Sequence, residues 1–162
     1  MEKPSTPPPK IGVNDRLLVQ YAVLTDSVGF TAGHGLFFVD GKEIGRVPCL
    51  AICEDKESEA LTLYFCGDDW NPIGIAPCAS IEAAKRKAER IYPGSSACWL
   101  KAHFTAEDAN RFVDEMWATQ RCSFCGKRPD EDPSTLFQGI GSARICGDCI
   151  RQFSNQFGNS KG

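Results

Sequence analysis

The stretch Cys122-Ser-Phe-Cys125, with Cys146-Gly-Asp-Cys149 following after 20 residues, decides the fold of the C-terminal part of this chain. Two Cys-x-x-Cys motifs at this separation are typical of a structural zinc site. Zinc prefers four ligands in a tetrahedron, and each short motif offers two thiolates to one ion without straining its backbone. The sequence therefore predicts one structural Zn²⁺ bound by Cys122, Cys125, Cys146 and Cys149. A closed shell of four thiolates leaves no position for water, so we expect this ion to hold structure and do no chemistry.

Two other interpretations of the four cysteines are a pair of redox-active motifs and a pair of structural disulfides. The presence of two matched motifs argues against redox chemistry. Residues 1–10 are polar and proline-rich, without an apolar signal core, which argues against secretion and so against disulfides. No stretch is long and apolar enough to span a bilayer. We therefore expect a cytoplasmic protein that is not associated with a membrane.

The charge balance bears on the class of partner. The chain has 18 basic and 21 acidic residues, for a formal net charge of −3, which argues against a protein that binds duplex nucleic acid. Residues 121–153 carry five basic and four acidic side chains, hence +1, and four thiolates on one Zn²⁺ add −2. We therefore do not expect nucleic acid as a partner.

The composition suggests four segments along the 162 residues. Residues 1–10, with four prolines, are expected to be a disordered proline-rich tail. Residues 11–118 are long enough for one α+β domain with its own core. Residues 119–157 form the four-cysteine finger, which is too short to fold without its metal. Residues 158–162 are expected to be a second tail.

Five segments of the first domain have the alternation or β-branched composition of strands. They are residues 17–24, 36–39, 47–53, 61–66 and 70–75. Asp40-Gly41 is expected to turn a hairpin, because glycine accepts a positive φ. The connections between the segments are short, which favours antiparallel pairing, since parallel strands need long crossovers.

Two helices are predicted after these strands, giving an α+β fold with an antiparallel sheet and two helices. Ser80 is the predicted N-cap of the first helix, and Pro93-Gly94 ends it. Thr105 and Asp108 form a capping box on the second helix. The predicted inner stripes are Ile81, Ala84, Ala88 and Ile91 on the first helix and Ala109, Phe112, Val113 and Met116 on the second. A third helix is predicted to open at the last cysteine, with Ile150, Phe153 and Phe157 along one side.

The finger resembles the four-cysteine zinc finger of ClpX, the bacterial protein-unfolding ATPase. The residues that carry the resemblance are Cys122-Ser-Phe-Cys-Gly-Lys127 and Ile145-Cys-Gly-Asp-Cys-Ile150. The resemblance covers only this C-terminal module; residues 11–118 resemble no domain of known activity. It implies a small treble-clef-like unit in which the four cysteines bind zinc. It also implies dimerisation and the recruitment of adaptor or unfolded substrate proteins.

The chain departs from the ClpX pattern in three respects. Its spacer between the two motifs is longer, Ile140 follows Gly139 where the family has proline, and Arg144 replaces an aromatic residue. These changes leave the metal site intact but affect the surfaces that the family uses for dimerisation and substrate binding. The sequence also lacks the motif Gly-x-x-x-x-Gly-Lys-Ser/Thr, so we expect no AAA+ ATPase domain and no ATP binding.

Other residues that could carry chemistry are scattered along the first domain. They are Cys49, Cys53, Cys66, Cys78, Cys98, His34 and His103. Their spacing is irregular, and cysteine is a common buried residue, so core or surface thiols explain them better than a second metal site does. A Cys–His nucleophile pair would require spatial proximity that the sequence does not reveal. We therefore name no catalytic residue and no cofactor besides zinc.

The leading functional hypothesis is a non-enzymatic protein-interaction module. Its expected partners are other proteins, with a homodimer as one possibility, and binding to unfolded protein as another. The alternatives are a nucleic-acid-binding regulator and an immunity-type protein that neutralises a toxin by binding it. A thiol-dependent or hydrolytic enzyme in the first domain has support only from His34 and the scattered cysteines.

Overall fold

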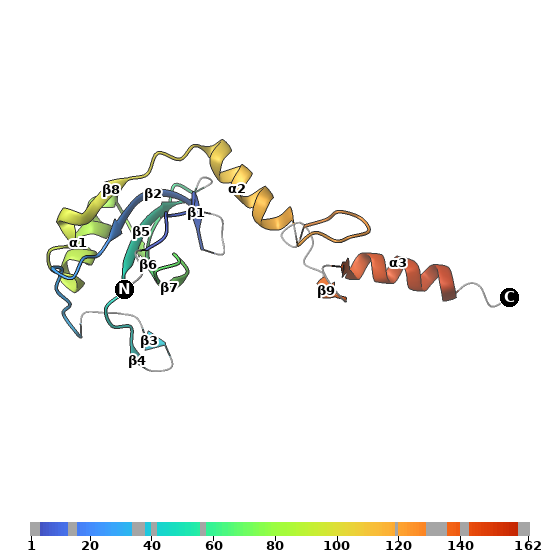
Figure 1. The fold of residues 1–162 in the computed structure, drawn as a ribbon, viewed down its shortest axis with the longest axis horizontal. Coiled ribbons are helices and arrows are strands. Elements are labelled where there is room, and N and C mark those ends of the chain that lie inside the picture. The colour runs from blue at the N-terminus through green and yellow to red at the C-terminus, as the bar shows by residue number, and fades with distance from the viewer. Residues whose placement is uncertain are drawn as a thin grey trace. The chain divides into compact units, whose positions relative to one another are not determined.

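The computed structural model describes residues 4–12, 16–33, 38–39, 42–55, 58–118, 120–128, 136–139 and 143–158. Internal contacts divide the chain into two compact units, Met1–Phe112 and Val113–Gly162. Figure 1 labels the helices and strands of both units. None of the helices within the described residues has the length and apolar composition to cross a membrane.

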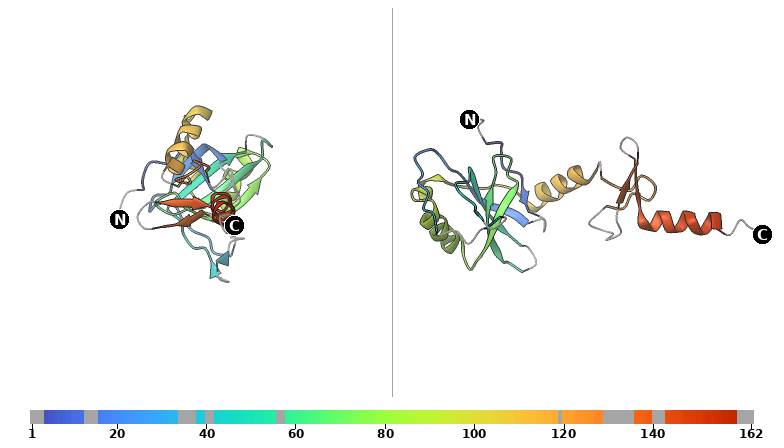
Figure 2. Two further views of the ribbon diagram at one scale, coloured as in Figure 1. Left: turned by 90° about the vertical axis from the view of Figure 1, so that its right-hand side faces the viewer. Right: turned by 90° about the horizontal axis from the view of Figure 1, so that it is seen from below.

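The first unit is built on a six-stranded sheet in which every pairing is antiparallel. Its order is β1-β2-β5-β6-β7, and β8 pairs with the same side of β2 as β1. Figure 2 shows the sheet from two further directions. The strand bounds are β1 Lys10–Ile11, β2 Arg16–Val23, β5 Cys49–Glu54, β6 Leu61–Cys66, β7 Pro72–Cys78 and β8 Trp99–Lys101. The predicted α+β fold with an antiparallel sheet is confirmed.

Three predicted strands lie within two residues of β2, β5 and β6, whereas other elements differ. The last predicted strand, 70–75, is shifted to β7 and is longer than expected. The strands β3 (Phe38–Val39) and β4 (Lys42–Glu43) form a separate two-stranded sheet, and the Asp40-Gly41 turn predicted between them lies outside the described residues. The sequence did not predict β1, β8 or the 3-10 helix η1 (Ser95–Cys98).

The sheet buries apolar side chains on both of its faces. Leu50 and Ile52 of β5 point into a core shared with helix α1 (Ile81–Ile91), while Cys49 and Cys53 of the same strand point into a second core. The second core also holds Trp70, whose ring packs edge-on against Tyr21 at a centroid distance of 5.7 Å. Because successive side chains of a strand face opposite ways, the continuous apolar run of β5 fits a strand buried on both sides.

Residues 4–9 pack against the first unit and do not form the disordered tail predicted for residues 1–10. The indole Nε1 of Trp70 donates a hydrogen bond to the Ser5 carbonyl at 2.6 Å, and the Leu18 N–H donates to the Pro9 carbonyl at 2.8 Å. Pro7 is buried. Proline loses little backbone conformational entropy on folding and keeps its carbonyl as a hydrogen-bond acceptor. An extended proline segment therefore packs at a low entropic cost where hydrogen-bond donors face it.

Helix α1 follows the local signals in its sequence. The Ser80 hydroxyl accepts a hydrogen bond from the Ala83 N–H at 3.0 Å, which confirms the predicted N-cap. Ala84, Ala88 and Ile91 are buried against the sheet, as predicted. Beyond the helix, Gly94 has a φ of +94°, a conformation that favours glycine.

Helix α2 (Ala106–Ala118) spans the boundary between the two units. Its capping box is confirmed, since Thr105 Oγ1 accepts from the Asp108 N–H at 3.1 Å and the Thr105 N–H donates to the Asp108 carboxylate at 2.9 Å. Ala109 and Val113 are buried, but Met116 is 38% exposed, so its predicted inward position is wrong. Ala109 belongs to the first unit and Met116 to the second, so the apolar stripe of the helix does not face one continuous core.

The second unit contains a hairpin and a helix around the cysteines. Strand β9 (Leu136–Gln138) pairs antiparallel with β10 (Arg144–Cys146), and α3 (Gly147–Gly158) follows directly. Its small core consists of Cys122, Cys146 and Cys149, with Ile145 and Phe153 packed against it. A cysteine turn, a hairpin and a helix in this order correspond to the predicted treble-clef-like finger.

Candidate metal centre

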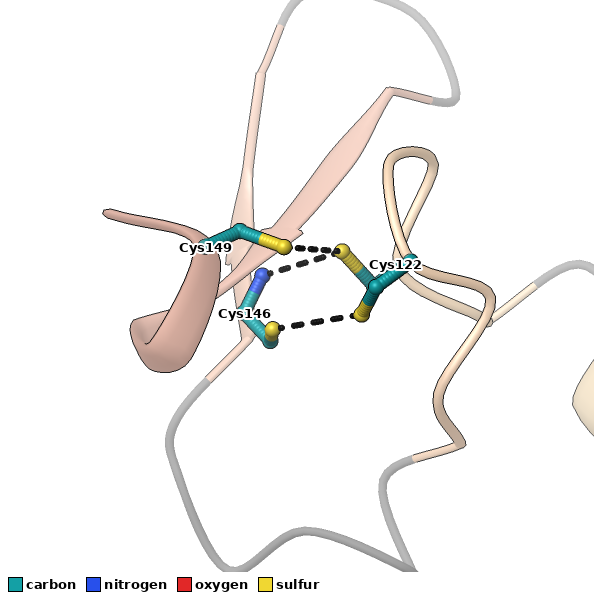
Figure 3. Close-up of side chains that lie close together, drawn as sticks. Cys122, Cys146 and Cys149 are labelled. Carbon is teal, nitrogen blue, oxygen red and sulfur yellow. Dashed lines mark hydrogen bonds between the residues drawn. The ribbon is translucent and has the colours of Figure 1, made fainter. Parts of the chain in front are cut away.

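The four predicted cysteines meet at one point of the second unit. Their sulfur atoms all lie within 4.8 Å of one another. The Sγ atoms of Cys122 and Cys149 are 3.8 Å apart, and those of Cys125 and Cys146 are 3.6 Å apart; Figure 3 shows Cys122 facing Cys146 and Cys149. A tetrahedral zinc with Zn–S bonds of about 2.3 Å requires sulfur atoms separated by about 3.8 Å. The cluster therefore has the dimensions and the soft donors that Zn²⁺ requires.

The first cysteine pair lies on a tight turn. The Gly126 N–H donates to the Cys122 carbonyl at 2.9 Å, and the Cys122 N–H donates to the Lys127 carbonyl at 2.9 Å. Gly126 has a φ of +74°, which glycine adopts without the clash that a Cβ would introduce. This turn directs Cys122 and Cys125 to the same side of the backbone.

The second cysteine pair lies where β10 passes into α3. Cys146 is the last residue of the strand, and Cys149 lies in the first turn of the helix. Two hydrogen bonds join the two pairs: the Ser123 N–H donates to the Arg144 carbonyl at 2.8 Å, and the Arg144 N–H donates to the Ser123 side-chain hydroxyl at 3.0 Å. Arg144, which departs from the ClpX pattern in its side chain, thus holds the site through its backbone.

Two thiols of the cluster have pKa values shifted in opposite directions. Burial opposes ionisation of Cys122, but backbone N–H groups of Cys125, Phe124 and Cys146 that donate to its sulfur lower its pKa to about 6. Burial, followed by the neighbouring thiols, raises the pKa of Cys149 to about 12. A thiolate at one sulfur thus disfavours ionisation of the neighbouring thiol. A divalent cation at the centre of the cluster would offset this repulsion.

Ion pairs surround the centre and occupy most of the basic side chains that the structure describes there. Asp148 binds the ammonium of Lys127 at 3.1 Å and also pairs with Arg151. Asp114 on α2 binds Arg128 at 2.7 Å and lies 3.9 Å from Arg121. The surface around the finger is therefore a mixture of both signs of charge and not a basic patch.

Two aromatic side chains lie next to the centre. Phe124, between the first two cysteines, is 62% exposed and packs edge-on against Phe153 of α3 at a centroid distance of 5.3 Å. The apolar side of α3 predicted Phe153, whereas Phe124 was not predicted. The signal for Phe124 was an aromatic residue inside a tight cysteine turn, where it has no core to enter. Ile150 is partly buried, and the side chain of Phe157 lies outside the described residues.

The other candidate residues form no second metal site within the part of the chain that the structure describes. The finger cysteines are its one group of three or more His, Cys, Asp or Glu side chains placed to share an ion. Cys49, Cys53 and Cys66 share the second core of the sheet, whereas Cys78 and Cys98 are partly buried and His103 is exposed. His34 lies outside the described residues. Burial raises the pKa of Cys49 to about 11 and that of Cys66 to about 12, and it also raises the pKa of Cys53.

Residues 120–157 match the family model described as the ClpX C4-type zinc finger. This segment is a zinc finger of that type. Its cysteine cluster is accordingly the site of one structural Zn²⁺. No ATPase domain accompanies the finger in the 162 residues, which contain no phosphate-binding Gly-x-x-x-x-Gly-Lys-Ser/Thr motif. No curated protein and no solved structure matches the chain.

Proposed function

We propose that this chain is a protein-interaction module that contacts its partners through the ClpX-type zinc finger. The observation that carries the proposal is the aromatic pair Phe124 and Phe153 on the outside of a closed metal site. Aromatic side chains supply a large contact area at a low entropic cost and are enriched in protein interfaces. The zinc holds the turn that presents Phe124, which gives the metal a structural role in binding.

We further propose that one partner of the finger is a second copy of the chain. An exposed aromatic ring beside a partly buried one is an apolar patch that the same patch of a second copy can cover, and most homo-oligomers associate through the same surface on both copies. Phe137 of β9, which is 53% exposed, adds apolar area to the same unit. The same surface would also serve to bind a different protein, such as an adaptor or an unfolded substrate. A toxin that the chain neutralises by binding would be one such partner.

Sedimentation analysis of three proteins tests self-association. In the wild-type chain we expect a dimer that dissociates on dilution, and in Phe124→Asp a monomer that retains one zinc. The matched control is Leu100→Asp in the first unit, which introduces the same charge at a site that is 55% exposed and leaves the finger untouched. A wild-type chain that is monomeric at every concentration contradicts the dimer.

A photo-cross-linking amino acid at position 124 tests the broader interaction. In cells of the native host we expect polypeptide adducts from this position and none from the same amino acid at position 100. Equal labelling from both positions, or none from either, counts against an interaction surface on the finger. A toxin, an adaptor or a second copy of the chain would be identified from the adduct by mass spectrometry.

We propose a binding role and no catalysis. A four-thiolate shell leaves zinc no open position for a water or a substrate. Nucleophilic thiols need a depressed pKa, whereas burial raises the pKa of Cys49, Cys53 and Cys66. ATP turnover that co-purifies with the chain through stringent washing would contradict this. Reduced thiols also suit the cytoplasm, which is where we propose that the protein acts.

A nucleic-acid-binding regulator has less support. Lys127, Arg128 and Arg151 are paired with carboxylates, so contact with phosphates would first have to break ion pairs. Gel-shift titrations over a range of salt concentrations separate the two functions. Binding that weakens steeply with rising salt would favour the nucleic-acid role, because phosphate contacts release counterions.

A further inference from the structure

Strand β7 is an open edge of the first unit's sheet within the described residues. The sheet order ends at β7, whereas β1 and β8 cover the far side of β2 (Figure 1). An edge strand presents unpaired N–H and C=O groups that a further strand can bind. Whether β7 is suited to this depends on the direction of its backbone groups, its side chains and its charge.

The hydrogen-bond alternation shows which backbone groups of β7 face outward. The Asp55 N–H donates to the Ala60 carbonyl at 2.9 Å in the turn between β5 and β6. In an antiparallel ladder, bonded and non-bonded pairs alternate along the strands. With the observed register, Thr62 and Tyr64 therefore bond to β5, and Leu63 bonds to its partner Ala76 on β7. Ile75, the residue before Ala76, consequently directs its N–H and C=O away from the sheet.

A proline supports the same assignment independently. Pro77 lies opposite Thr62, and a proline cannot donate to a ladder. A proline is tolerated on an edge strand where its nitrogen points away from the sheet. The hydrogen-bond alternation places the nitrogens of both Pro77 and Ile75 on this outward side. The outward window of β7 is therefore centred on Ile75 and bounded by Pro77 and Pro72.

The side chains of this window are apolar and open to solvent. Ile75 is 55% exposed and Ile73 is 44% exposed. No charged residue occurs from 70 to 80, although edge strands are commonly protected by lysine or other charges. This edge therefore combines outward-facing backbone groups, a β-branched apolar surface and the absence of charge.

We infer that the β7 edge binds an extended, uncharged segment of a partner polypeptide as an added antiparallel strand. This inference rests on the proposed protein-interaction function and specifies the class of partner. A window of about five residues is only about 17 Å long. A pairing of this length buries well below the roughly 1,200–2,000 Å² of a stable interface between folded proteins. It suits an extended segment held mainly through backbone hydrogen bonds better than it suits a second folded copy.

A synthetic heptapeptide of alternating threonine and valine, blocked at both ends and labelled with fluorescein through a flexible linker, is the probe. Fluorescence anisotropy is measured with the full-length, zinc-loaded chain. We expect saturable binding to the wild type and binding weaker by about tenfold or more to Ile75→Pro, because the outward N–H is lost and its acceptor stays unpaired. Ile75→Val, which keeps both the N–H and a β-branched side chain, is the matched control and should bind within about threefold of the wild type.

A second peptide with the same side chains and an N-methyl group on every residue keeps the test decisive if Ile75→Pro unfolds. It cannot donate backbone hydrogen bonds, so we expect no binding to the wild type. Equal binding of both peptides, or no binding of the unmethylated peptide at millimolar concentration, overturns the inference. Wild-type self-association that Ile75→Pro abolishes also overturns it, because the occupant would then be a second copy. Phe124→Asp should bind the peptide normally, which separates this test from that of the finger.

Discussion

Cys122 of the zinc centre is oriented by backbone hydrogen-bond donors. The Cys146 N–H lies 3.4 Å from the Cys122 sulfur, and further N–H groups of the first turn favour its thiolate form. Metal ligands that are oriented in this way lose little freedom when the ion binds. Removing one thiolate should therefore affect the whole finger and not a single bond.

The variant Cys146→Ser tests the ligand set. Serine is a poor zinc ligand, and the finger gains roughly 10–16 kcal/mol from its metal. We expect elemental analysis to fall from one zinc per chain to well below one, and the second unit to unfold while the first persists. Cys98→Ser, a cysteine outside the cluster, should retain the full zinc content. Full zinc occupancy in Cys146→Ser would contradict the assigned centre.

Gly12 is fixed both by its backbone and by a neighbour. Its φ is +90°, and a Cβ on it would lie 2.7 Å from the Tyr64 hydroxyl oxygen. We expect Gly12→Ala to lower the free energy of unfolding by about 3 kcal/mol, combining the cost of a left-handed conformation with that of overpacking. The matched control is Gly33→Ala, with a φ of +83° and no atom within 4 Å, which should cost only about 1 kcal/mol. Equal losses in urea unfolding would show that the Tyr64 contact contributes nothing.

At the scale of elements, helix α1 is held at both ends by side chains. Ser80 caps its first turn, and beyond its last turn the Glu89 carboxylate accepts hydrogen bonds from the N–H groups of Gly94 and Ser96, each at 2.7 Å. Glu89 also accepts a hydrogen bond from the Ser95 hydroxyl at 3.2 Å. One carboxylate thus fixes the start of the turn that leads from α1 to β8.

This contact makes the stability of the first unit depend on pH. The Gly94 N–H, followed by Ser96 and Ser95, lowers the pKa of Glu89 below its usual value. Because the pKa of Glu89 is lower in the folded state than in the unfolded state, where it is near 4.3, the ionised carboxylate stabilises the fold at pH values above about 4.3. This stabilisation is lost as the pH falls through the folded-state pKa. We expect Glu89→Gln to lose less stability than the wild type between about pH 5 and pH 3. Parallel curves from urea unfolding across this range would contradict the assignment.

At the scale of the whole molecule, the two units are stabilised by different forces. The first buries apolar side chains on both faces of a sheet, whereas the second has a core of three cysteines and two partly buried apolar residues. A core of that size is too small to support folding without metal. The chain therefore combines a unit that depends on the hydrophobic effect with one that depends on zinc.

Removal of the metal should separate the two units experimentally. After treatment with a strong chelator under reducing conditions, we expect amides in 143–158 to exchange with deuterium at once. Amides in 61–66, at the centre of the sheet, should keep the protection that they have in the zinc-loaded chain, since β6 is paired on both sides. Hydrogen exchange measured by mass spectrometry checks both segments. Simultaneous loss of protection in both would show that the first unit also needs the ion.

Local sequence by itself determined the zinc ligands, the N-cap of α1, the capping box of α2 and three central strands. Each depends on residues a few positions apart: two cysteines on one turn, Ser80 with Ala83, Thr105 with Asp108, or the alternation within β6. Each of these patterns is visible within a few residues of the chain, so spacing and residue type were sufficient to predict them.

Only the tertiary structure decided where the short and distant segments lie. Strand β8 has three residues and no strand-like alternation, and it exists because the exposed side of β2 offers unpaired backbone groups. Residues 4–9 pack because Trp70, more than 60 positions away, donates to Ser5. The exposure of Met116 and the contact between Phe124 and Phe153 likewise depend on which surfaces meet. Backbone pairing and packing between remote segments are set by three-dimensional proximity, which residue spacing along the chain does not encode.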